Sequence, residues 1–153
     1  ISLGSETLAP YAKADGEGRP LFSLPGRSHE RVPFLAYSSG AYLGRLVDLL
    51  LKQAGEPLYL DPIYETDMAD GLKAMALEGH GLAFLPASSV KHELRARRLI
   101  PAGSALAGKA LEVAIEIRLY REKPELARHP KPAALALWEF LRNQAATPAS
   151  VHA

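Results

Sequence analysis

The pattern of apolar positions is clearest between Leu43 and Ala54, where apolar side chains recur at helical spacing. They fall at i, i+3, i+4, i+7, i+8 and i+11, which places them along one face of an α-helix. These positions are Leu43, Leu46, Val47, Leu50, Leu51 and Ala54. We expect Ser38-Ser39-Gly40 to open this helix and Gly55 to end it, because glycine is favoured just beyond the last helical turn.

Short apolar segments alternate with two further helical patterns. The segments predict strands over residues 32–37, 58–65 and 81–85, with one or two more strands within residues 1–13. Helices are predicted from Thr66 or Asp67 to Glu78-Gly79, and over residues 88–98. Because strands and helices alternate along the chain, this order predicts the α/β class, with a parallel-type sheet flanked by helices.

Two more elements are predicted nearer the C-terminus. Residues 111–120 alternate apolar and polar side chains with a period of two, which predicts a strand with one solvent-exposed face. A final helix is predicted from Pro132, a residue that suits the first helical position. Its expected buried face consists of Ala134, Leu137, Trp138 and Leu141.

Composition narrows the class of protein. The 153 residues carry 18 Lys and Arg against 17 Asp and Glu, and a net charge of +1 gives no overall field for nucleic-acid binding. The chain contains no Cys, which permits a cytoplasmic location, and no apolar run is long enough to predict a membrane span. Because it begins Ile1-Ser2-Leu3 without Met, we expect a processed product or a piece of a longer protein.

Candidate catalytic motifs do not meet their structural requirements. Residues 103–110 carry the glycines and lysine of a phosphate-binding loop, but Ala110 stands where Ser or Thr would hold magnesium, and a strand follows. There is no Gly-x-Ser-x-Gly elbow, and the histidines are too scattered to predict a metal site. We therefore expect no enzymatic activity, no cofactor and no bound metal.

Three junctions between a predicted strand and a predicted helix remain as candidate functional positions. They are Tyr37-Ser38-Ser39-Gly40, Glu65-Thr66-Asp67 and Pro86-Ala87-Ser88-Ser89. In parallel α/β sheets, ligands bind where the carboxyl ends of strands meet the N-termini of helices. Hydroxyls and free backbone N–H groups at these junctions predict a cleft for a small molecule.

One long motif resembles a known family. Residues 71–86 read GLKAMALEGHGLAFLP and are followed by Glu93-Leu94 and Arg98-Leu99-Ile100-Pro101. This motif is similar to the C-terminal effector-binding domain of LysR-type transcriptional regulators, in which a helix ends in V-x-x-G-x-G-I-A-x-L-P. Leu82 replaces the common Ile and Arg98 the common Gly. The resemblance implies a periplasmic-binding-protein-like (type 2) fold of two lobes, with the effector bound in the cleft between them.

The resemblance also implies a domain organisation and a set of ligand residues. Residues 1–85 would form the second lobe, and residues 86–153 the returning part of the first, without the DNA-binding domain and the start of the first lobe. Ser38, Ser39, Thr66 and Phe84 stand at positions that line the cleft in the family. The implied partners are a small-molecule effector or oxidant, further copies of the chain in a dimer or tetramer, and DNA through a helix-turn-helix that this chain lacks.

Three interpretations remain open at this point. Gly4 to Pro10, Tyr42 to Arg45, and the pair Met68 and Met75 are similar to the hypochlorite-responsive subgroup, which implies redox sensing by methionine oxidation. Packing in the core is the simpler explanation for both methionines. A solute-binding protein of the same architecture is the alternative function. A small enzyme using Asp67 or His80 is a third.

Overall fold

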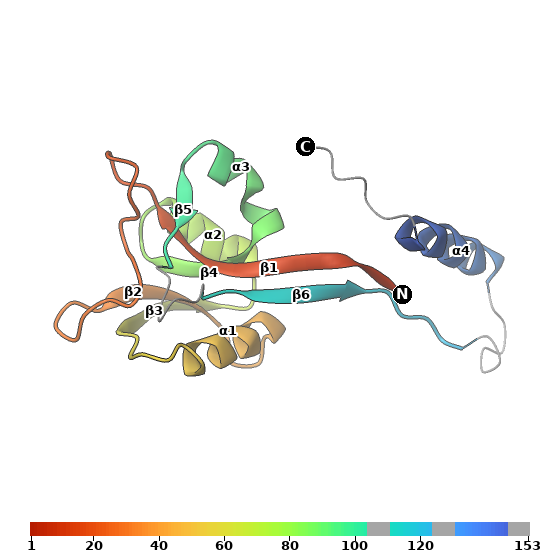
Figure 1. Cartoon of the computed structure of the whole chain (residues 1–153), viewed down its shortest axis with the longest axis horizontal. Coiled ribbons are helices and arrows are strands. Elements are labelled where there is room, and N and C mark those ends of the chain that lie inside the picture. Colours follow the sequence, from red (N-terminus) through yellow and green to blue (C-terminus); the bar gives the residue numbers. More distant parts are fainter. Residues whose placement is uncertain (104–110, 124–130, 147–153) are drawn as a thin grey trace. The chain divides into compact units, whose positions relative to one another are not determined.

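The computed structural model describes residues 1–103, 111–123 and 131–146. Contacts divide the chain into two compact units, one of Thr7–Ala114 and one of Ile1–Glu6 with Ile115–Ala153. The predicted lobe boundary after Leu85 follows the family architecture and remains a prediction. The two units hold a mixed α/β fold, as predicted (Figure 1).

The sheet contains six strands, ordered β3-β2-β4-β1-β5, with β6 also paired to β1. Their bounds are β1 Ser2–Lys13, β2 Val32–Tyr37, β3 Leu60–Thr66, β4 Leu82–Pro86, β5 Leu99–Pro101 and β6 Val113–Arg118. Strands β3 and β4 both pair with β2 in the parallel sense, as the strand–helix alternation predicts. Strand β1, in contrast, is antiparallel to β4 and β5, so the sheet is mixed.

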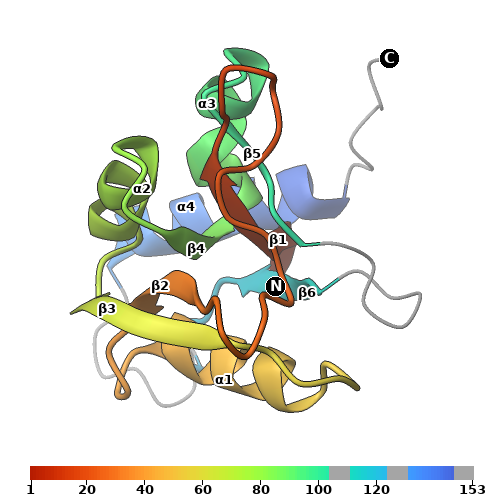
Figure 2. The same cartoon turned by 90° about the vertical axis from the view of Figure 1, so that its left-hand side faces the viewer.

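Helices cover both faces of the sheet within Thr7–Ala114. Helix α1 (Tyr42–Lys52) lies on one face and α2 (Ala69–Leu77) on the other (Figure 2). The α2 side chains Leu72 and Ala76 are fully buried where the helix contacts β2 and β4. Large apolar side chains from both layers make the core, namely Leu8, Leu35, Leu72, Leu82, Phe84, Leu85, Val90 and Leu99.

Helix α2 ends as the sequence predicts. The N–H of Gly79 donates to the carbonyl of Ala76 at 2.9 Å, and the N–H of His80 donates to the carbonyl of Met75 at 3.1 Å. Gly79 has a φ of +83°, a left-handed conformation that glycine adopts without steric penalty. This pair of bonds is a Schellman motif, so the predicted role of Gly79 as helix terminator is confirmed.

The helix predicted over residues 88–98 is shorter than expected. A 3₁₀ turn, η1 (Ala87–Val90), precedes α3 (Lys91–Arg95). The helix stops because Arg97 adopts a φ of 52° and its N–H donates to the carbonyl of Leu94 at 3.1 Å. Arg97 thus ends the helix in a left-handed conformation that L-residues rarely adopt. Strand β5, which follows, was not predicted.

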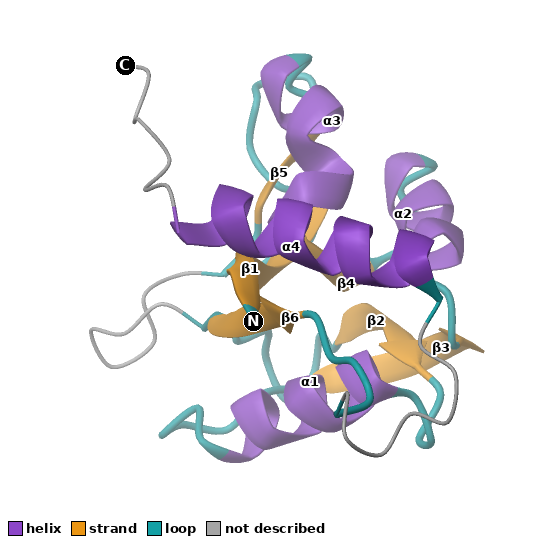
Figure 3. Cartoon of the chain, turned by 90° about the vertical axis from the view of Figure 1, so that its right-hand side faces the viewer, coloured by secondary structure: helices purple, strands orange, loops and turns teal. Residues whose placement is uncertain are grey.

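Helix α4 (Pro132–Ala146) forms where the sequence predicts it, but its predicted buried face is wrong (Figure 3). Ala134 is exposed and Leu137 is 58% exposed, whereas Trp138 and Leu141 are half-buried. The guanidinium of Arg121 lies 4.4 Å from the centre of the Trp138 ring, a cation–π contact. Helical periodicity predicts an apolar face, and the described residues supply no layer that covers the whole of it.

Candidate ligand-binding site

The parallel pairing of β2 with β3 and β4 brings the predicted strand–helix junctions to one edge of the sheet. Tyr37 and Thr66 are register partners at the ends of β2 and β3, and the N–H of Ser38 donates to the carbonyl of Thr66 at 3.0 Å. Leu35 is in register with Ala83 of β4, so β4 ends at the same edge. The structure therefore assembles the carboxyl edge that the sequence predicts.

Ser38 and Ser39 lie in a tight turn before α1. The N–H of Ala41 donates to the Ser38 carbonyl at 2.9 Å, and α1 begins at Tyr42 with Ala41 as its N-cap. The helix therefore starts later than predicted, and within the described residues no side chain caps it by a hydrogen bond. Ser38 is half-buried and Ser39 exposed, so Ser39 faces solvent at this edge. Their role as ligand contacts remains a prediction.

Thr66 connects β3 to the start of α2. Its Oγ1 accepts a hydrogen bond from the N–H of Met68 at 3.3 Å. Met68, rather than Thr66 or Asp67, is the N-cap, with extended φ and ψ of −104° and 119°. The N-cap lies one residue after the later of the two predicted caps, and the Thr66 hydroxyl holds the chain up to Met68 in a non-helical turn. Thr66 is thus held at the helix start, where its predicted ligand contact is untested.

The two methionines differ in their surroundings. Met68 is 62% exposed and stands at the N-cap position, before the first helical residue of α2. Met75 is half-buried within the helix. The core-packing explanation is therefore wrong for Met68.

Phe84 lies in the interior of the unit. Its side chain is 1% exposed, and its ring packs edge-on against Phe34 with centroids 6.3 Å apart and planes at 85°. Edge-to-face contact of this kind is a favourable arrangement for two aromatic rings. Phe84 therefore has a clear packing role, and its predicted contact with a ligand remains a prediction.

The third junction is connected to α2 by polar contacts. The hydroxyl of Ser89 donates to the carbonyl of Pro86 at 2.8 Å. The ammonium of Lys73 donates to the carbonyl of Ser89 at 3.2 Å and lies 3.4 Å from a carboxylate oxygen of Asp70. Lys73 therefore joins η1, the turn that follows β4, to the first turns of α2.

Tyr37 belongs to the first of the predicted junctions, although it was not among the predicted ligand residues. The residue is 7% exposed, and its buried hydroxyl has no hydrogen-bond partner among the described residues. Burial raises the pKa of the Tyr37 phenol above its usual range, and the negative charge of Asp70 raises it further. The phenol consequently stays protonated and offers a donor. In the sequence, its place directly before Ser38 was the one available signal.

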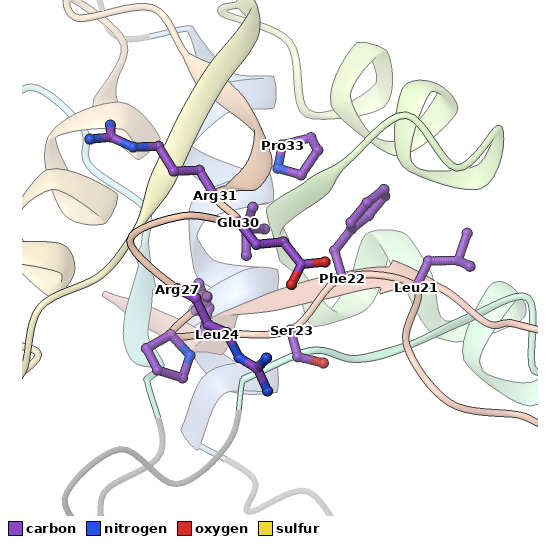
Figure 4. A pocket seen from close by; sticks show the side chains of 11 residues that line it. Leu21, Phe22, Ser23, Leu24, Arg27, Glu30, Arg31 and Pro33 are labelled. Carbon is purple, nitrogen blue, oxygen red and sulfur yellow. The ribbon is translucent and has the colours of Figure 1, made fainter.

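A separate hollow of about 570 Å³ lies near the opposite end of β2 (Figure 4). It is formed by the loop before β2, and Glu30 and Arg27 lie on its wall while the guanidinium of Arg31 points away from Glu30. Gly26 shapes this loop, because a Cβ there would stand 2.9 Å from the carbonyl oxygen of Tyr59. The sequence did not single out this region.

The remaining chemical interpretations find little support. Within the described ranges, no three His, Asp, Glu or Cys side chains cluster as metal ligands would. The phosphate-loop candidate at residues 103–110 lies outside the described residues beyond Gly103. Asp67 and His80, the candidates for an enzyme, are both exposed. No helix in the described part of the chain is both long and apolar enough to cross a membrane.

The chain is an α/β domain whose strand–helix junctions meet at one edge of the sheet, the place where ligands bind in α/β folds of this kind. The family described as LysR substrate binding domain matches residues 2–146. The chain therefore belongs to the LysR substrate-binding domain family, as its motif predicts. This result favours the regulator over the solute-binding protein of similar architecture.

Two relatives and one solved structure illustrate the similarity. The chain is 30% identical over 143 residues to the HTH-type transcriptional regulator YjiE of Escherichia coli K12, covering 94% of this chain and 43% of YjiE. It is equally similar to the HTH domain-truncated regulator QseD of E. coli O157:H7, covering 94% of this chain and 54% of QseD. The chain thus spans about half the length of these relatives, which are described as regulators and not as enzymes.

The solved structure is the regulatory domain of HypT from Salmonella typhimurium. It superposes with a TM-score of 0.76 at 27% identity, covering 95% of this chain and 64% of that one. Full-length HypT is described as a hypochlorite-specific LysR-type transcriptional regulator. The predicted periplasmic-binding-protein-like fold is confirmed by this family and its structures.

Proposed function

We propose that this chain is the effector-sensing region of a cytoplasmic LysR-type transcription factor. A small molecule binds at the carboxyl edge of β2, β3 and β4, in contact with Ser38, Ser39 and Thr66. The observation that carries this proposal is the register of Tyr37 with Thr66, which brings the carboxyl ends of β2 and β3, and with them Ser38 and Thr66, to one edge of the sheet. Helix starts offer backbone N–H groups that no helical carbonyl accepts, and these suit a polar ligand.

Binding at this edge has a regulatory consequence in the full-length protein. The effector stabilises one arrangement of the two lobes, residues 1–85 and 86–153 here, and thereby changes the geometry of an oligomer. A helix-turn-helix domain outside this chain then reads DNA in that geometry. Exposed apolar side chains on α1 and β3 support self-association, since such side chains gather at interfaces. They are Tyr42, Leu49, Ile63 and Tyr64.

The proposal is tested by replacing Ser39, whose hydroxyl faces solvent. A metabolite library screened by thermal shift identifies a ligand, and calorimetry then compares its affinity for the variants. We expect Ser39→Ala to weaken binding about 5-fold or more, as loss of one hydrogen bond predicts. Ser28→Ala, an exposed serine in the loop that precedes β2, is the matched control and should bind as the unchanged chain does. Equal affinity of all three chains would contradict the proposed site.

A second candidate function is sensing of an oxidant at Met68. The exposure of this thioether supports it, together with the similarity to HypT. Oxidation converts a methionine thioether to a polar sulfoxide, and accessible side chains react first. We expect hypochlorite to oxidise Met68 ahead of Met75, as measured by peptide mass spectrometry.

Leucine variants separate oxidation from its consequence. Met68→Leu keeps a similar volume without the reactive sulfur, and Met75→Leu is the matched control. If the switch lies at Met68, hypochlorite changes the oligomeric state of the unchanged chain and of Met75→Leu, but not of Met68→Leu. A response that persists in Met68→Leu would contradict this function.

A further inference from the structure

The hollow of about 570 Å³ before β2 is held in shape by the fold (Figure 4). Backbone hydrogen bonds join its walls to distant segments. The N–H of Leu24 donates to the carbonyl of Ala102 at 2.9 Å, and the N–H of Tyr59 donates to the carbonyl of Pro25 at 2.9 Å. Leu24 and Val32, two of its lining residues, are buried. The hollow has a volume typical of small-molecule sites, and the chain's own bonds fix its walls.

Two opposite charges line this hollow without pairing with each other. Arg27 and Glu30 are partners in a tight turn, in which the N–H of each donates to the carbonyl of the other at 3.1 Å. Side chains of such a pair project from the same face, with Cβ atoms roughly 4.5–5.5 Å apart. Among the described residues, neither side chain forms an ion pair or a hydrogen bond. Both charges are therefore available to a ligand.

Both charged side chains point toward the preceding stretch of the loop. In Figure 4, Glu30 points toward Phe22. Arg27 points toward Ser23, an exposed residue. Leu21 is 46% exposed and Phe22 is half-buried, so this stretch also presents apolar surface to solvent. Because covering apolar surface is favourable, a ligand that fits here combines charged groups with an apolar group.

We propose that this hollow binds a free amino acid with an apolar side chain. The α-carboxylate accepts from the guanidinium of Arg27 and from the hydroxyl of Ser23. The α-ammonium donates to the carboxylate of Glu30, close to the ring of Phe22, because an aromatic face attracts a cation. The side chain of the ligand covers Leu21 and Phe22. The hollow lies at the opposite end of β2 from the candidate ligand-binding edge, so this second site goes beyond the proposed function.

The charges of the hollow select a zwitterion over other small ligands. A dicarboxylate or a phosphate ester would bring a second negative charge close to Glu30, and a diamine would bring a positive charge close to Arg27. Arg31 also lines the hollow, but its guanidinium points away from Glu30. An amino acid carries both of its charges on groups bonded to one carbon atom. This arrangement matches two side chains of opposite charge that project from the same face of a tight turn.

The test titrates the whole chain with L-leucine and follows the backbone amides of Gly26, Arg27 and Glu30 by nuclear magnetic resonance. Because both charged side chains are exposed, we expect a dissociation constant on the order of 1 mM. N-acetyl-leucine lacks the ammonium and leucinamide lacks the carboxylate, so each should bind about fivefold more weakly or worse. Glycine lacks the apolar side chain and should also bind more weakly than leucine.

Two variants assign the two charges separately. Glu30→Gln should weaken leucine binding about fivefold or more, but it should not weaken N-acetyl-leucine, which has no ammonium. Arg27→Gln should weaken leucine binding to a similar degree, but it should not weaken leucinamide, which has no carboxylate. Glu56→Gln and Arg95→Gln are the matched controls. They make the same changes at exposed residues outside the hollow and should bind leucine as the unchanged chain does.

Three results would overturn the inference. If leucine at about 20 mM, well above the expected dissociation constant, shifts none of the three amides, the hollow does not bind an amino acid. If leucine binds, but Glu30→Gln and Arg27→Gln bind it as the unchanged chain does, the two charges are solvated surface groups. If leucine shifts the amides of Ser38 and Ser39 instead, it binds at the carboxyl edge. In that case the inference is wrong and the proposed function stands.

Discussion

Replacing Phe84 with alanine is expected to lower the free energy of unfolding by about 3–5 kcal/mol, the range for a buried aromatic residue. The ring is 1% exposed, lies in β4 between β2 and β1, and packs edge-on against Phe34. Its removal leaves a cavity next to several strands that are fixed by hydrogen bonds, so the structure has little freedom to collapse into it. Urea denaturation of the whole chain, followed by circular dichroism, measures the change.

Phe140→Ala is the matched control, because Phe140 is 59% exposed on α4. We expect its effect to stay within about 0.5 kcal/mol, as is usual for surface positions. A similar small effect for Phe84→Ala would contradict the packing described for β4. Because Phe84→Ala is expected to lose several kcal/mol of stability, Phe84→Leu is the better variant for testing whether Phe84 contacts a ligand. It keeps most of the volume and should cost less than about 1.5 kcal/mol.

Local patterns in the sequence predicted most helices and strands of the fold. Most of the apolar stripe from Leu43 to Ala54 lies in α1, although the helix ends at Lys52 with Gln53 as its C-cap and not at the predicted Gly55. The alternation within residues 111–120 contains β6. Gly79 ends α2 because its left-handed conformation is a local property of the chain. Such features depend on neighbours within a few residues, which is why periodicity and capping identify them.

Pairing between distant segments was harder to predict. Strand β1 lies antiparallel to β4, with Leu8 opposite Pro86, although the alternation of strands and helices predicts parallel neighbours. Strand β5 is only three residues long, too short for a period to show. The exposure of Leu137 on α4 was missed for a similar reason. A helical period predicts an apolar face, but it does not identify the layer that packs against that face. Partner choice depends on three-dimensional contacts that the pattern does not encode.

The candidate site likewise combines features that the sequence pattern predicts with features that depend on contacts between distant segments. The positions of Ser38 and Thr66 at one edge follow from parallel pairing of adjacent strands, and this was predictable. Tyr37 lies in the first predicted junction, but its hydroxyl was not predicted as a ligand contact, because a tyrosine at the end of an apolar run is typical of a strand. Whether its hydroxyl has a partner depends on the atoms that a packed helix brings to it, and the Cβ of Tyr37 lies beside Gly44 of α1. This information exists only once the helix is placed on the sheet.

Replacing Gly81 with alanine is expected to lower the free energy of unfolding by about 2–3 kcal/mol, within the range for overpacking a buried position. A Cβ at this residue would stand 2.7 Å from the Pro33 carbonyl oxygen and 3.1 Å from Leu35 Cγ, and a backbone carbonyl in a paired strand has little room to move. Gly81 is buried just before β4, in a loop where glycines are also typical of close approach to a ligand. Denaturation in urea again measures the change.

The neighbours of Gly81 decide between these two explanations. Both atoms closest to its Cβ position belong to β2. The absence of a side chain at Gly81 therefore allows β2 to pack closely against the chain that leads into β4. Gly16→Ala is the matched control, since no described heavy atom lies within 4 Å of a Cβ built there. Its effect should stay within about 0.5 kcal/mol. If Gly81→Ala instead keeps its stability and loses affinity for the effector, the glycine contacts ligand and the packing explanation is wrong.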